Sequence, residues 1–329
     1  MEKGYTVSIT GVGSFLPRKV LTNDDLTRML DTTDEWITKR TGIKERRIVE
    51  NGVAASDLAM EASLRALDDA NILPSEVDLI VAATITPDCL VPSTACFIQE
   101  KIGAKNAGAF DILAACAGFV YALSIAKGFV ASGAMKTVLV IGTECLSKIT
   151  DYTDRSTCIL FGDGAGAVVV QRGNGKREIV TTYLGSDGSK ADLLTLSAGG
   201  PRLPASQATI ESHSHYIQLK GKELFKTAIN NMVDMIVKAA AENNMQVEDI
   251  DLIIPHQSNI RIIEAAMEKL KLPKKKAYVN IGRYGNTSAA SIPIAIDEVD
   301  KEELLNPGDS VLLVAFGGGL TWGTSFIKW

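Results

Sequence analysis

Residues 78–84 read DLIVAAT, and 173 positions after the start of this stretch residues 251–254 read DLII. A second pair of stretches matches at the same shift, TVLVI at 137–141 and SVLLV at 310–314. Short runs of Val, Ile and Leu of this kind are typical of strands that are buried on both faces of a sheet. Because both pairs share one shift, we predict that the chain contains two copies of the same folding unit.

The helical segments support the same repeat. An apolar face with i, i+3, i+7 spacing at positions 59, 62 and 66 recurs at positions 232, 235 and 239. Further helices are expected from about Ser93 and from about Cys116, each after a predicted strand. This alternation of strands and helices predicts an α/β fold with helices on both faces of a sheet.

Length and composition limit what the chain can do. Its 329 residues suffice for two halves, which we place at 1–172 and 173–329. A net charge of −5 argues against nucleic acid as a main partner. The apolar runs are too short to span a membrane, and the N-terminal MEKGYTVSIT lacks the apolar stretch of a signal peptide. Five cysteines without a CxxC pair are therefore expected to be reduced thiols in a cytoplasmic protein.

Three residues whose side chains could take part in catalysis follow predicted strands of the two repeats. Cys116 lies in DILAACAGFV, His256 in LIIPHQSN and Asn286 in GRYGNTSAAS. At the shift of 173, His256 aligns with Ala83 at the end of an equivalent strand. Ligands gather outside the carboxyl ends of the strands in open α/β sheets. We therefore expect these three side chains at one edge of the molecule.

Each of the three residues also has a purely structural interpretation. A cysteine between alanines is often a small buried hydrophobe, although the N–H groups and dipole of a helix start stabilise a thiolate and lower its pKa. His256 fits a core histidine that is bonded to the backbone, and Asn286 alone fits a helix cap. Their combination at one edge favours a nucleophilic cysteine.

Three further motifs have more than one interpretation. His213 and His215 form an HxH pair for which no third metal ligand is evident. The glycines of FGDGAGAVVV (161–170) lead into a strand and not into a helix, which disfavours nucleotide binding. The glycines of AFGGGLTWG (315–323) either form a tight turn or let a backbone N–H approach an oxyanion.

Six stretches, taken in order, resemble β-ketoacyl-acyl-carrier-protein synthase type III, the condensing enzyme that starts bacterial fatty-acid synthesis. They are TDEWITKRTGIKERR (33–47), DILAACAGF, DRSTCILFGDGAGA (154–167), IPHQSNIRI, GNTSAASIP and FGGGLTWG. The resemblance covers essentially the whole chain. It implies the thiolase fold, a duplicated α/β architecture with five αβαβα layers, which agrees with the repeat.

The resemblance implies a catalytic triad of Cys116, His256 and Asn286. Cys116 would take the acyl group from an acyl-CoA, and malonyl-acyl carrier protein would then lose CO2 and condense with it to give β-ketoacyl-acyl carrier protein. His256 and Asn286 would bind the enolate oxygen, and the backbone N–H groups of Cys116 and Gly318 would form a second oxyanion hole. No metal or other cofactor is implied, because the carboxylate leaves as CO2.

The resemblance also implies binding surfaces and a homodimer. Trp36, Arg40 and Arg155 would bind CoA; Val91, Phe161 and Phe316 would line the acyl pocket; Arg261 and Lys226 would dock acyl carrier protein. Two positions depart from the family pattern. Lys222 replaces an asparagine near the pantetheine arm, and no binding role is transferred to it. Val91 replaces a phenylalanine on a loop that reaches the partner's acyl pocket, so we expect a deeper pocket that accepts longer or branched primers.

Three other functions fit parts of this pattern. A condensing enzyme of secondary metabolism would use the same fold with a different starter or with malonyl-CoA. A non-catalytic partner subunit would only shape another subunit's pocket, which the retention of all three triad residue types disfavours. A cysteine hydrolase would cleave thioesters without releasing CO2.

Overall fold

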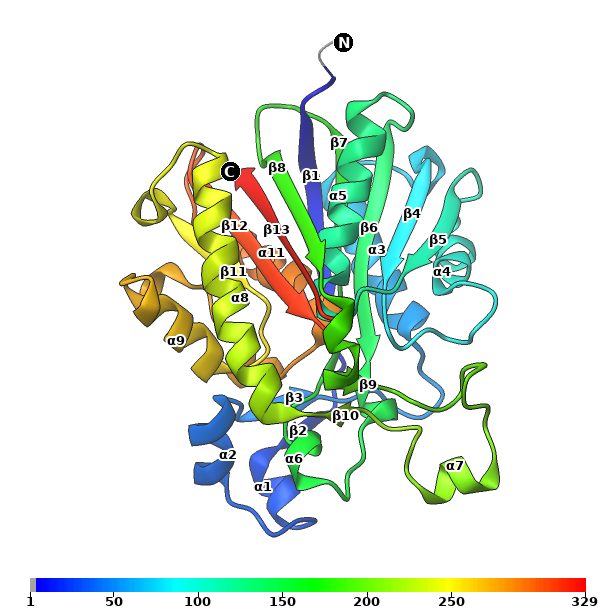
Figure 1. The fold of residues 1–329 in the computed structure, drawn as a ribbon. Coiled ribbons are helices and arrows are strands. Elements are labelled where there is room, and N and C mark those ends of the chain that lie inside the picture. Colours follow the sequence, from blue (N-terminus) through cyan, green and yellow to red (C-terminus); the bar gives the residue numbers. More distant parts are fainter. Residues whose placement is uncertain (1–3) are drawn as a thin grey trace.

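The computed structural model describes residues 4–329, and within them nine strands form one mixed sheet (Figure 1). In order across the sheet these are β11 (Leu252–Pro255), β12 (Ser310–Gly317), β13 (Thr321–Lys328), β8 (Glu178–Ser186), β1 (Val7–Phe15), β7 (Asp163–Arg172), β6 (Thr137–Cys145), β4 (Leu79–Ala83) and β5 (Gly108–Ile112). Residues 1–3, which begin the N-terminal stretch MEKGYTVSIT, lie outside the described residues. Among residues 4–329 no helix combines the length and the apolar character needed to cross a membrane.

The sheet repeats itself with the shift seen in the sequence. Leu79 and Leu252, which begin β4 and β11, are 173 positions apart, and so are the first residues of β6 and β12. The parallel pairing of β4 with β6 recurs between β11 and β12. The predicted strands at 78–84, 137–141, 251–254 and 310–314 are therefore confirmed. Because β7 ends at Arg172 and β8 begins at Glu178, we propose that the two halves meet at positions 172 and 173.

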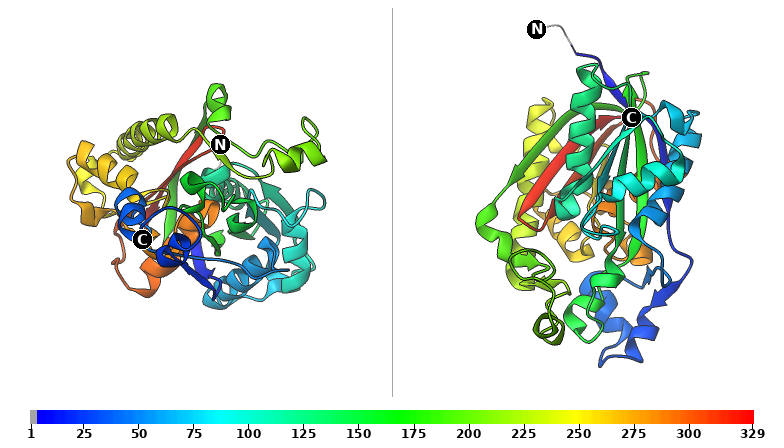
Figure 2. Two further views of the ribbon diagram at one scale, coloured as in Figure 1. Left: turned by 90° about the horizontal axis from the view of Figure 1, so that it is seen from below. Right: turned by 90° about the vertical axis from the view of Figure 1, so that its right-hand side faces the viewer.

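Six helices complete the layers of the duplicated fold. On the outside of the first half, α3 (Ala55–Asp69) packs on β1, β6 and β7, with α4 (Thr94–Ile102) beside it on β5. On the outside of the second half, α8 (Gly221–Glu242) packs on β12 and β13, with α9 (Ile260–Lys269) against it. Between them, α5 (Gly118–Ala131) and α11 (Ser291–Lys301) contact strands of both halves. Figures 1 and 2 show α8 and α9 on one side of the molecule and α3 and α4 on the other.

Apolar patterning explains this packing. Ala59, Ala62 and Ala66 of α3 are fully buried, and so are their counterparts on α8 at 232, 235 and 239, as the sequence predicted. All five residues of β4 are buried, which accounts for its unbroken apolar run. The backbone of α3 lies so close to β1 that a Cβ on Gly11 would overlap the carbonyl oxygen of Ala66.

Short elements gather at one end of the molecule. They are β2 (Val20–Thr22), α1 (Asn23–Thr27), α2 (Asp34–Thr41), β3 (Glu45–Arg47), α6 (Arg155–Cys158), β9 (Leu194–Thr195), α7 (Gln207–Glu211), β10 (Gln218–Leu219) and α10 (Ile281–Tyr284). In Figure 1 most of them lie below the arrowheads of β6 and β12. They therefore cover the carboxyl ends of the parallel strands, which is where the sequence placed the candidate site.

Two equivalent turns cross between the halves at this end. A 3₁₀ turn over Ala115–Ala117 packs on β12 of the second half, and one over Ser288–Ala290 packs on β6 of the first half. Their first residues, Ala115 and Ser288, both adopt left-handed φ angles, 46° and 47°. The turns come so close to the strands that a Cβ on Gly142 would overlap the carbonyl oxygen of Ala289. The helix expected from Cys116 thus begins at Gly118, after a tight turn that carries the cysteine.

Candidate active site

The three triad candidates line one cavity of about 670 Å³. Cys116 comes from the turn before α5, His256 from the end of β11, and Asn286 from the loop that enters the turn before α11. The cavity therefore combines one side chain from the first repeat with two from the second. Seven other predicted site residues also line it: Trp36, Arg40, Arg155, Phe161, Arg261, Phe316 and Gly318.

The positions of Val91, Lys226 and Lys222 relative to the cavity differ from what the sequence suggested. Val91 is 85% exposed on the loop before α4, and Lys226 is exposed on α8; neither lines the cavity. Lys222, to which no binding role was transferred, does line it. The acyl-pocket role expected for Val91 and the docking role expected for Lys226 therefore concern surfaces outside the cavity of a single chain.

The cavity holds Cys116 as a buried thiol. Its side chain is only 8% exposed, and burial raises the pKa of the thiol to about 12. We expected the helix start to lower this pKa, and that expectation is wrong for the free protein because the desolvation of the thiolate outweighs the other effects. The Ser288 hydroxyl acts in the opposite direction and favours the thiolate. The side chain of Cys116 is therefore a neutral thiol at neutral pH.

His256 is held rigidly as a neutral imidazole. Its backbone N–H donates to Val314 O at 2.8 Å, and its Nδ1 lies 2.7 Å from Ser291 Oγ. Phe316 presents its ring edge to the imidazole at 6.4 Å between centroids. Burial lowers the pKa of His256 to about 3. The backbone N–H of Gln257 donates to Ser291 Oγ, and the hydroxyl of Ser291 can itself donate to Nδ1; in that tautomer the proton of the neutral ring is on Nε2.

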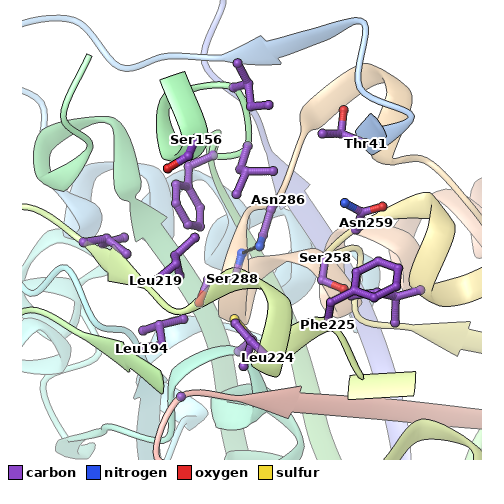
Figure 3. A pocket seen from close by; sticks show the side chains of 18 of the residues that line it. Thr41, Ser156, Leu194, Leu219, Leu224, Phe225, Ser258, Asn259, Asn286 and Ser288 are labelled. Atoms are coloured by element: carbon purple, nitrogen blue, oxygen red, sulfur yellow. Dashed lines mark hydrogen bonds between the residues drawn. The ribbon is translucent and has the colours of Figure 1, made fainter. Parts of the chain in front are cut away.

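Asn286 is oriented by its own turn. The backbone N–H of Ser288 donates to Asn286 Oδ1 at 2.8 Å, as the dashed line in Figure 3 marks. The backbone of Asn286 is fixed by bonds with Leu160 and Gly162 across the halves. With Oδ1 occupied in this way, the amide NH2 is the end that remains for a ligand. Asn286 therefore does cap its own turn, and this hydrogen bond fixes the direction in which its NH2 group points.

The mouth of the cavity carries a stacked group of aromatic and basic side chains. Trp36, on the surface helix α2, is half-buried, and the guanidinium groups of Arg40 and Arg155 lie 5.2 and 5.0 Å from its ring centroid. Arg155 also donates to the carbonyl oxygen of Asp31 at 2.7 Å. This arrangement offers both a flat apolar surface and two positive charges at the entrance.

The glycine-rich stretch 315–323 brings the end of β12 against the backbone of Cys116. A Cβ on Gly317 would lie 2.6 Å from the backbone nitrogen of Cys116 and 3.1 Å from Ala115 Cβ. Thr321 Oγ1 also donates to Ala114 O at 2.8 Å, which ties β13 to the same turn. Only glycine at position 317 permits this approach, so the position of the thiol depends on it.

We therefore predict a large effect of Gly317→Ala on the reactivity of Cys116. The added methyl group must displace the turn by several tenths of an ångström, and misplacement on this scale costs about 10- to 100-fold in rate. The rate of Cys116 acylation, followed by intact-protein mass spectrometry, checks this. Gly188→Ala is the matched control, since a Cβ there meets no atom within 4 Å. Equal acylation rates in both variants would contradict the prediction.

The HxH pair has other contacts. His213 Nδ1 lies 2.5 Å from Asp151 Oδ2, and His215 Nε2 lies 2.9 Å from Thr209 Oγ1. Among residues 4–329 no group of three or more His, Cys, Asp or Glu side chains is arranged to hold a metal ion. His213 thus fastens the segment around α7 to the loop before α6, whereas the contact of His215 stays within that segment.

Sequence reasoning missed three polar residues of the site. Ser291 positions His256, Ser288 lies beside the thiol, and Glu144 is buried behind both turns. A glutamate at the end of TVLVIGTE, a stretch with an apolar centre and no other charge, was a signal that could have been used, because carboxylates are seldom buried without a function or a partner.

Comparison with known proteins identifies the family. The sequence profile described as 3-oxoacyl-[acyl-carrier-protein (ACP)] synthase III matches residues 110–188, and the profile of the C-terminal part of these enzymes matches residues 240–329. The beta-ketoacyl-[acyl-carrier-protein] synthase III of Caldanaerobacter subterraneus subsp. tengcongensis is 54% identical over 100% of this chain and 99% of that protein. The chain belongs to the 3-oxoacyl-[acyl-carrier-protein] synthase III family.

Solved structures of 3-oxoacyl-[acyl-carrier-protein] synthase III enzymes agree with this assignment. The enzyme from Aquifex aeolicus is 49% identical, with a TM-score of 0.90 over 98% of this chain and 100% of that chain. The priming beta-ketosynthase of the R1128 polyketide biosynthetic pathway is 35% identical, with a TM-score of 0.91 over 100% of this chain and 97% of that chain. The resemblance drawn from the six motifs is thus confirmed, and so is the thiolase-type fold. Like the other members of this family, the chain is a condensing acyltransferase.

Proposed function

We propose that this enzyme starts fatty-acid synthesis by condensing an acyl-CoA primer with malonyl-acyl carrier protein, and that Cys116, His256 and Asn286 carry the chemistry. The observation that supports these roles is the meeting of the three side chains in one cavity of a chain that is 54% identical to a beta-ketoacyl-[acyl-carrier-protein] synthase III. From the same family membership we propose that it acts in the cytoplasm and needs no cofactor.

In the first half-reaction Cys116 forms the acyl-enzyme. Its sulfur attacks the thioester carbonyl of acyl-CoA, the bond to the CoA sulfur breaks, and the thiol proton ends on that sulfur, so that CoA leaves as a thiol. The backbone N–H groups of Cys116 and Gly318 are proposed to hold the oxyanion of the tetrahedral intermediate. A neutral Cys116 thiol suits this step, because the thiol can lose its proton after acyl-CoA has bound. The free enzyme then does not have to hold a buried thiolate.

In the second half-reaction malonyl-acyl carrier protein loses CO2. The electrons of the breaking carbon–carbon bond form an enolate, whose oxygen receives hydrogen bonds from His256 Nε2–H and the Asn286 NH2 group. The enolate carbon attacks the acyl carbonyl, the bond to Cys116 breaks, and the released thiolate takes a proton from solvent. The products are CO2 and β-ketoacyl-acyl carrier protein.

The decisive assay combines product analysis with CO2 release. The protein is incubated with an acyl-CoA and malonyl-acyl carrier protein, and free CoA, CO2 and the acyl state of the carrier are measured. One β-ketoacyl product for each CO2 supports condensation. Free acid and CoA without CO2 would instead show a thioester hydrolase. No turnover by the isolated protein would indicate a non-catalytic partner subunit.

A condensing enzyme of secondary metabolism is the second candidate. The match to the R1128 priming beta-ketosynthase favours it, because that protein shares 35% identity and the same fold with this chain. The two candidates differ in starter and extender. Preference for malonyl-CoA or for a dedicated carrier over the fatty-acid acyl carrier protein would select the second candidate.

Trp36 is proposed to bind the adenine of CoA. The purine would insert between the indole and the Arg155 guanidinium, with the Arg40 guanidinium also beside the indole. Trp36→Ala is expected to raise the KM for acyl-CoA about tenfold, the equivalent of ~1.4 kcal/mol, with little change in the maximal acylation rate. Trp36→Phe, which keeps a stacking ring, is the control. A loss confined to the maximal rate would contradict the binding role.

We propose a homodimer whose interface includes the loop before α4. Leu90, Val91 and the nearby Leu113 are 81%, 85% and 79% exposed in the single chain, which is unusual for side chains of this size. Docking of acyl carrier protein is proposed at Arg261 and Lys226. Arg261 lies at the cavity and also over the Phe225 ring at 5.3 Å.

If Val91 floors the acyl pocket of the partner, its size sets the range of primers. Val91→Phe is expected to reduce turnover with isobutyryl-CoA about tenfold relative to acetyl-CoA, because the larger ring fills the deeper pocket. Competition assays with paired primers measure the ratio. Turnover of acetyl-CoA alone by the unaltered enzyme, with none of butyryl- or isobutyryl-CoA, would refute the deeper pocket.

A further inference from the structure

Arg46 is a fully buried guanidinium group without a carboxylate partner. It lies on β3 and is 0% exposed. None of the ion pairs found within residues 4–329 includes it. Burial lowers the pKa of Arg46 only to about 10, so the side chain is still a cation at neutral pH. Because apolar side chains often stabilise an interior as well as a buried charge does, an arginine here indicates a positional role.

The guanidinium of Arg46 joins two segments that are far apart in the sequence. Its Nη2 donates at 2.7 Å to the carbonyl oxygen of Ile159, the residue that follows α6. Its Nη1 donates at 2.9 Å to Oδ1 of Asn23, the first residue of α1, and at 3.2 Å to the carbonyl oxygen of Leu21. A guanidinium is planar and rigid, so it holds the acceptors on its two sides at a fixed separation.

Asn23 extends this connection to α2. It is 1% exposed, and its Nδ2 donates to Asp34 Oδ1 at 2.8 Å, in the first turn of α2. Nδ2 also donates at 2.7 Å to the carbonyl oxygen of Ile43, just after the end of α2. The amide of Asn23 thus accepts from Arg46 with its oxygen and binds both ends of α2 with its nitrogen.

The two segments that are joined in this way carry the proposed adenine site. Trp36 and Arg40 belong to α2, and Arg155 is the first residue of α6. The 5.0 Å between the Arg155 guanidinium and the Trp36 ring is therefore a distance between α2 and α6. Figure 1 shows both helices, with α1, at the same end of the molecule. Apolar side chains of α1, α2 and α6 also pack in one cluster, but apolar contacts are non-directional, whereas hydrogen bonds fix a spacing.

We propose that Arg46 and Asn23 are positioning residues for the nucleotide end of CoA, because they hold α2 and α6 at the spacing that the site between Trp36 and Arg155 requires. The proposal rests on the proposed binding of CoA at Trp36 and adds a buried polar network beneath it. Neither Arg46 nor Asn23 lines the cavity, so they act through α2 and α6 and not by touching the substrate. A thioester that lacks the nucleotide should therefore not depend on them.

Three variants interrupt the network at different points. Arg46→Met removes the guanidinium and keeps the stem, which matters because a Cβ on Gly285, beside Asn286, would lie 3.3 Å from Arg46 Cβ. Arg46→Lys keeps a positive charge, but a single ammonium group cannot hold two acceptors at a fixed separation. Asn23→Ser shortens the side chain and breaks the link to α2.

Two measurements on the full-length enzyme separate nucleotide binding from the rest of the site. Calorimetric titration gives the affinity for adenosine 3′,5′-bisphosphate, which is the nucleotide end of CoA. Acylation of Cys116 is measured with acetyl-CoA and with acetyl-pantetheine, which carries the same thioester without the nucleotide. Arg47→Gln is the matched control, since Arg47 is the next residue of β3 and its side chain contacts Glu45 and the Tyr284 ring.

We expect each of the three variants to weaken nucleotide binding about tenfold and to raise the KM for acetyl-CoA by the same factor, with little change in the maximal acylation rate. With acetyl-pantetheine, kcat/KM should stay within about threefold of the unaltered enzyme. Because Arg46 and Asn23 belong to one network, the variant with both Arg46→Met and Asn23→Ser should lose less than the product of the two single losses. Arg47→Gln should leave all of these values unchanged.

Three results would overturn the proposal. Equal losses with acetyl-CoA and acetyl-pantetheine would show a general disturbance of the fold, and unaltered nucleotide affinity in all three variants would show that the network does not position the site. Fully additive losses in the double variant would show that Arg46 and Asn23 act separately. If Arg46→Met does not fold, Asn23→Ser carries the comparison of the two thioesters.

Trp36→Ala distinguishes this failure from failure of the proposed function. If Trp36→Ala binds the nucleotide as well as the unaltered enzyme does, CoA does not bind at Trp36, and both proposals fail. If Trp36→Ala binds it weakly while Arg46→Met and Asn23→Ser bind it normally, only the positioning role fails. An enzyme that no acyl-CoA acylates would refute the condensation function, and the calorimetric titration would still decide the role of Arg46 and Asn23.

Discussion

Replacement of Cys116 by alanine is expected to abolish condensation, with a loss on the order of 10⁴-fold or more, because the acyl intermediate is proposed to form on this thiol. Incubation with acyl-CoA should then give no mass increase in the intact protein. The other four cysteines do not substitute for it. Cys145 and Cys158 are buried away from the cavity, and Cys89 and Cys96 lie on the surface.

The same variant separates the two half-reactions. His256 and Asn286 are untouched by the change, so Cys116→Ala should still release CO2 from malonyl-acyl carrier protein, uncoupled from product formation. Cys116→Ser is the matched control for shape, since it keeps a nucleophile of similar size but weaker reactivity. An acylated alanine variant would show that another residue is the nucleophile and would remove the basis of the mechanism.

Much of the fold was predictable because the chain is duplicated. Buried strands read as apolar runs whatever lies around them, and two such runs at one shift locate their partners in the other half. The sequence therefore predicted β4, β6, β11 and β12, and it placed the triad candidates at their carboxyl ends. The residues at which individual helices begin were less predictable from the sequence. The 3₁₀ turn that delays α5 to Gly118 follows from packing against β12 of the other half, which no local pattern reveals.

The electrostatics of the site were not predictable from local sequence. A helix start suggested a lowered thiol pKa, but the depth of the cavity raises it, because burial depends on the elements that pack over the turn. Ser288 and Ser291 lie two and five positions after Asn286, and the sequence analysis assigned neither of them a role. Only the crossing of the two turns brings one beside the thiol and the other onto His256.

Loss of either proposed enolate donor, His256 or Asn286, is the second large effect that we expect. His256→Ala and Asn286→Ala should each slow decarboxylation and condensation by about 10²- to 10³-fold while Cys116 is still acylated by acyl-CoA. Because both donors are proposed to bind one oxygen, the double variant should lose less than the product of the two single losses. Acylation by mass spectrometry and CO2 release measured in parallel provide this separation.

A pH profile and one further variant test how the two proposed donors act. Burial keeps the pKa of His256 at about 3, so the imidazole stays neutral between pH 5 and pH 8 and its protonation should not reduce the decarboxylation rate on the acid side of this range. Asn286→Asp keeps the shape and can still accept from the Ser288 N–H, but it replaces the NH2 donor by an oxygen that repels the enolate. It should therefore be at least as slow as Asn286→Ala. An aspartate variant with near-normal CO2 release would mean that Asn286 only caps its turn, and the enolate would need another donor.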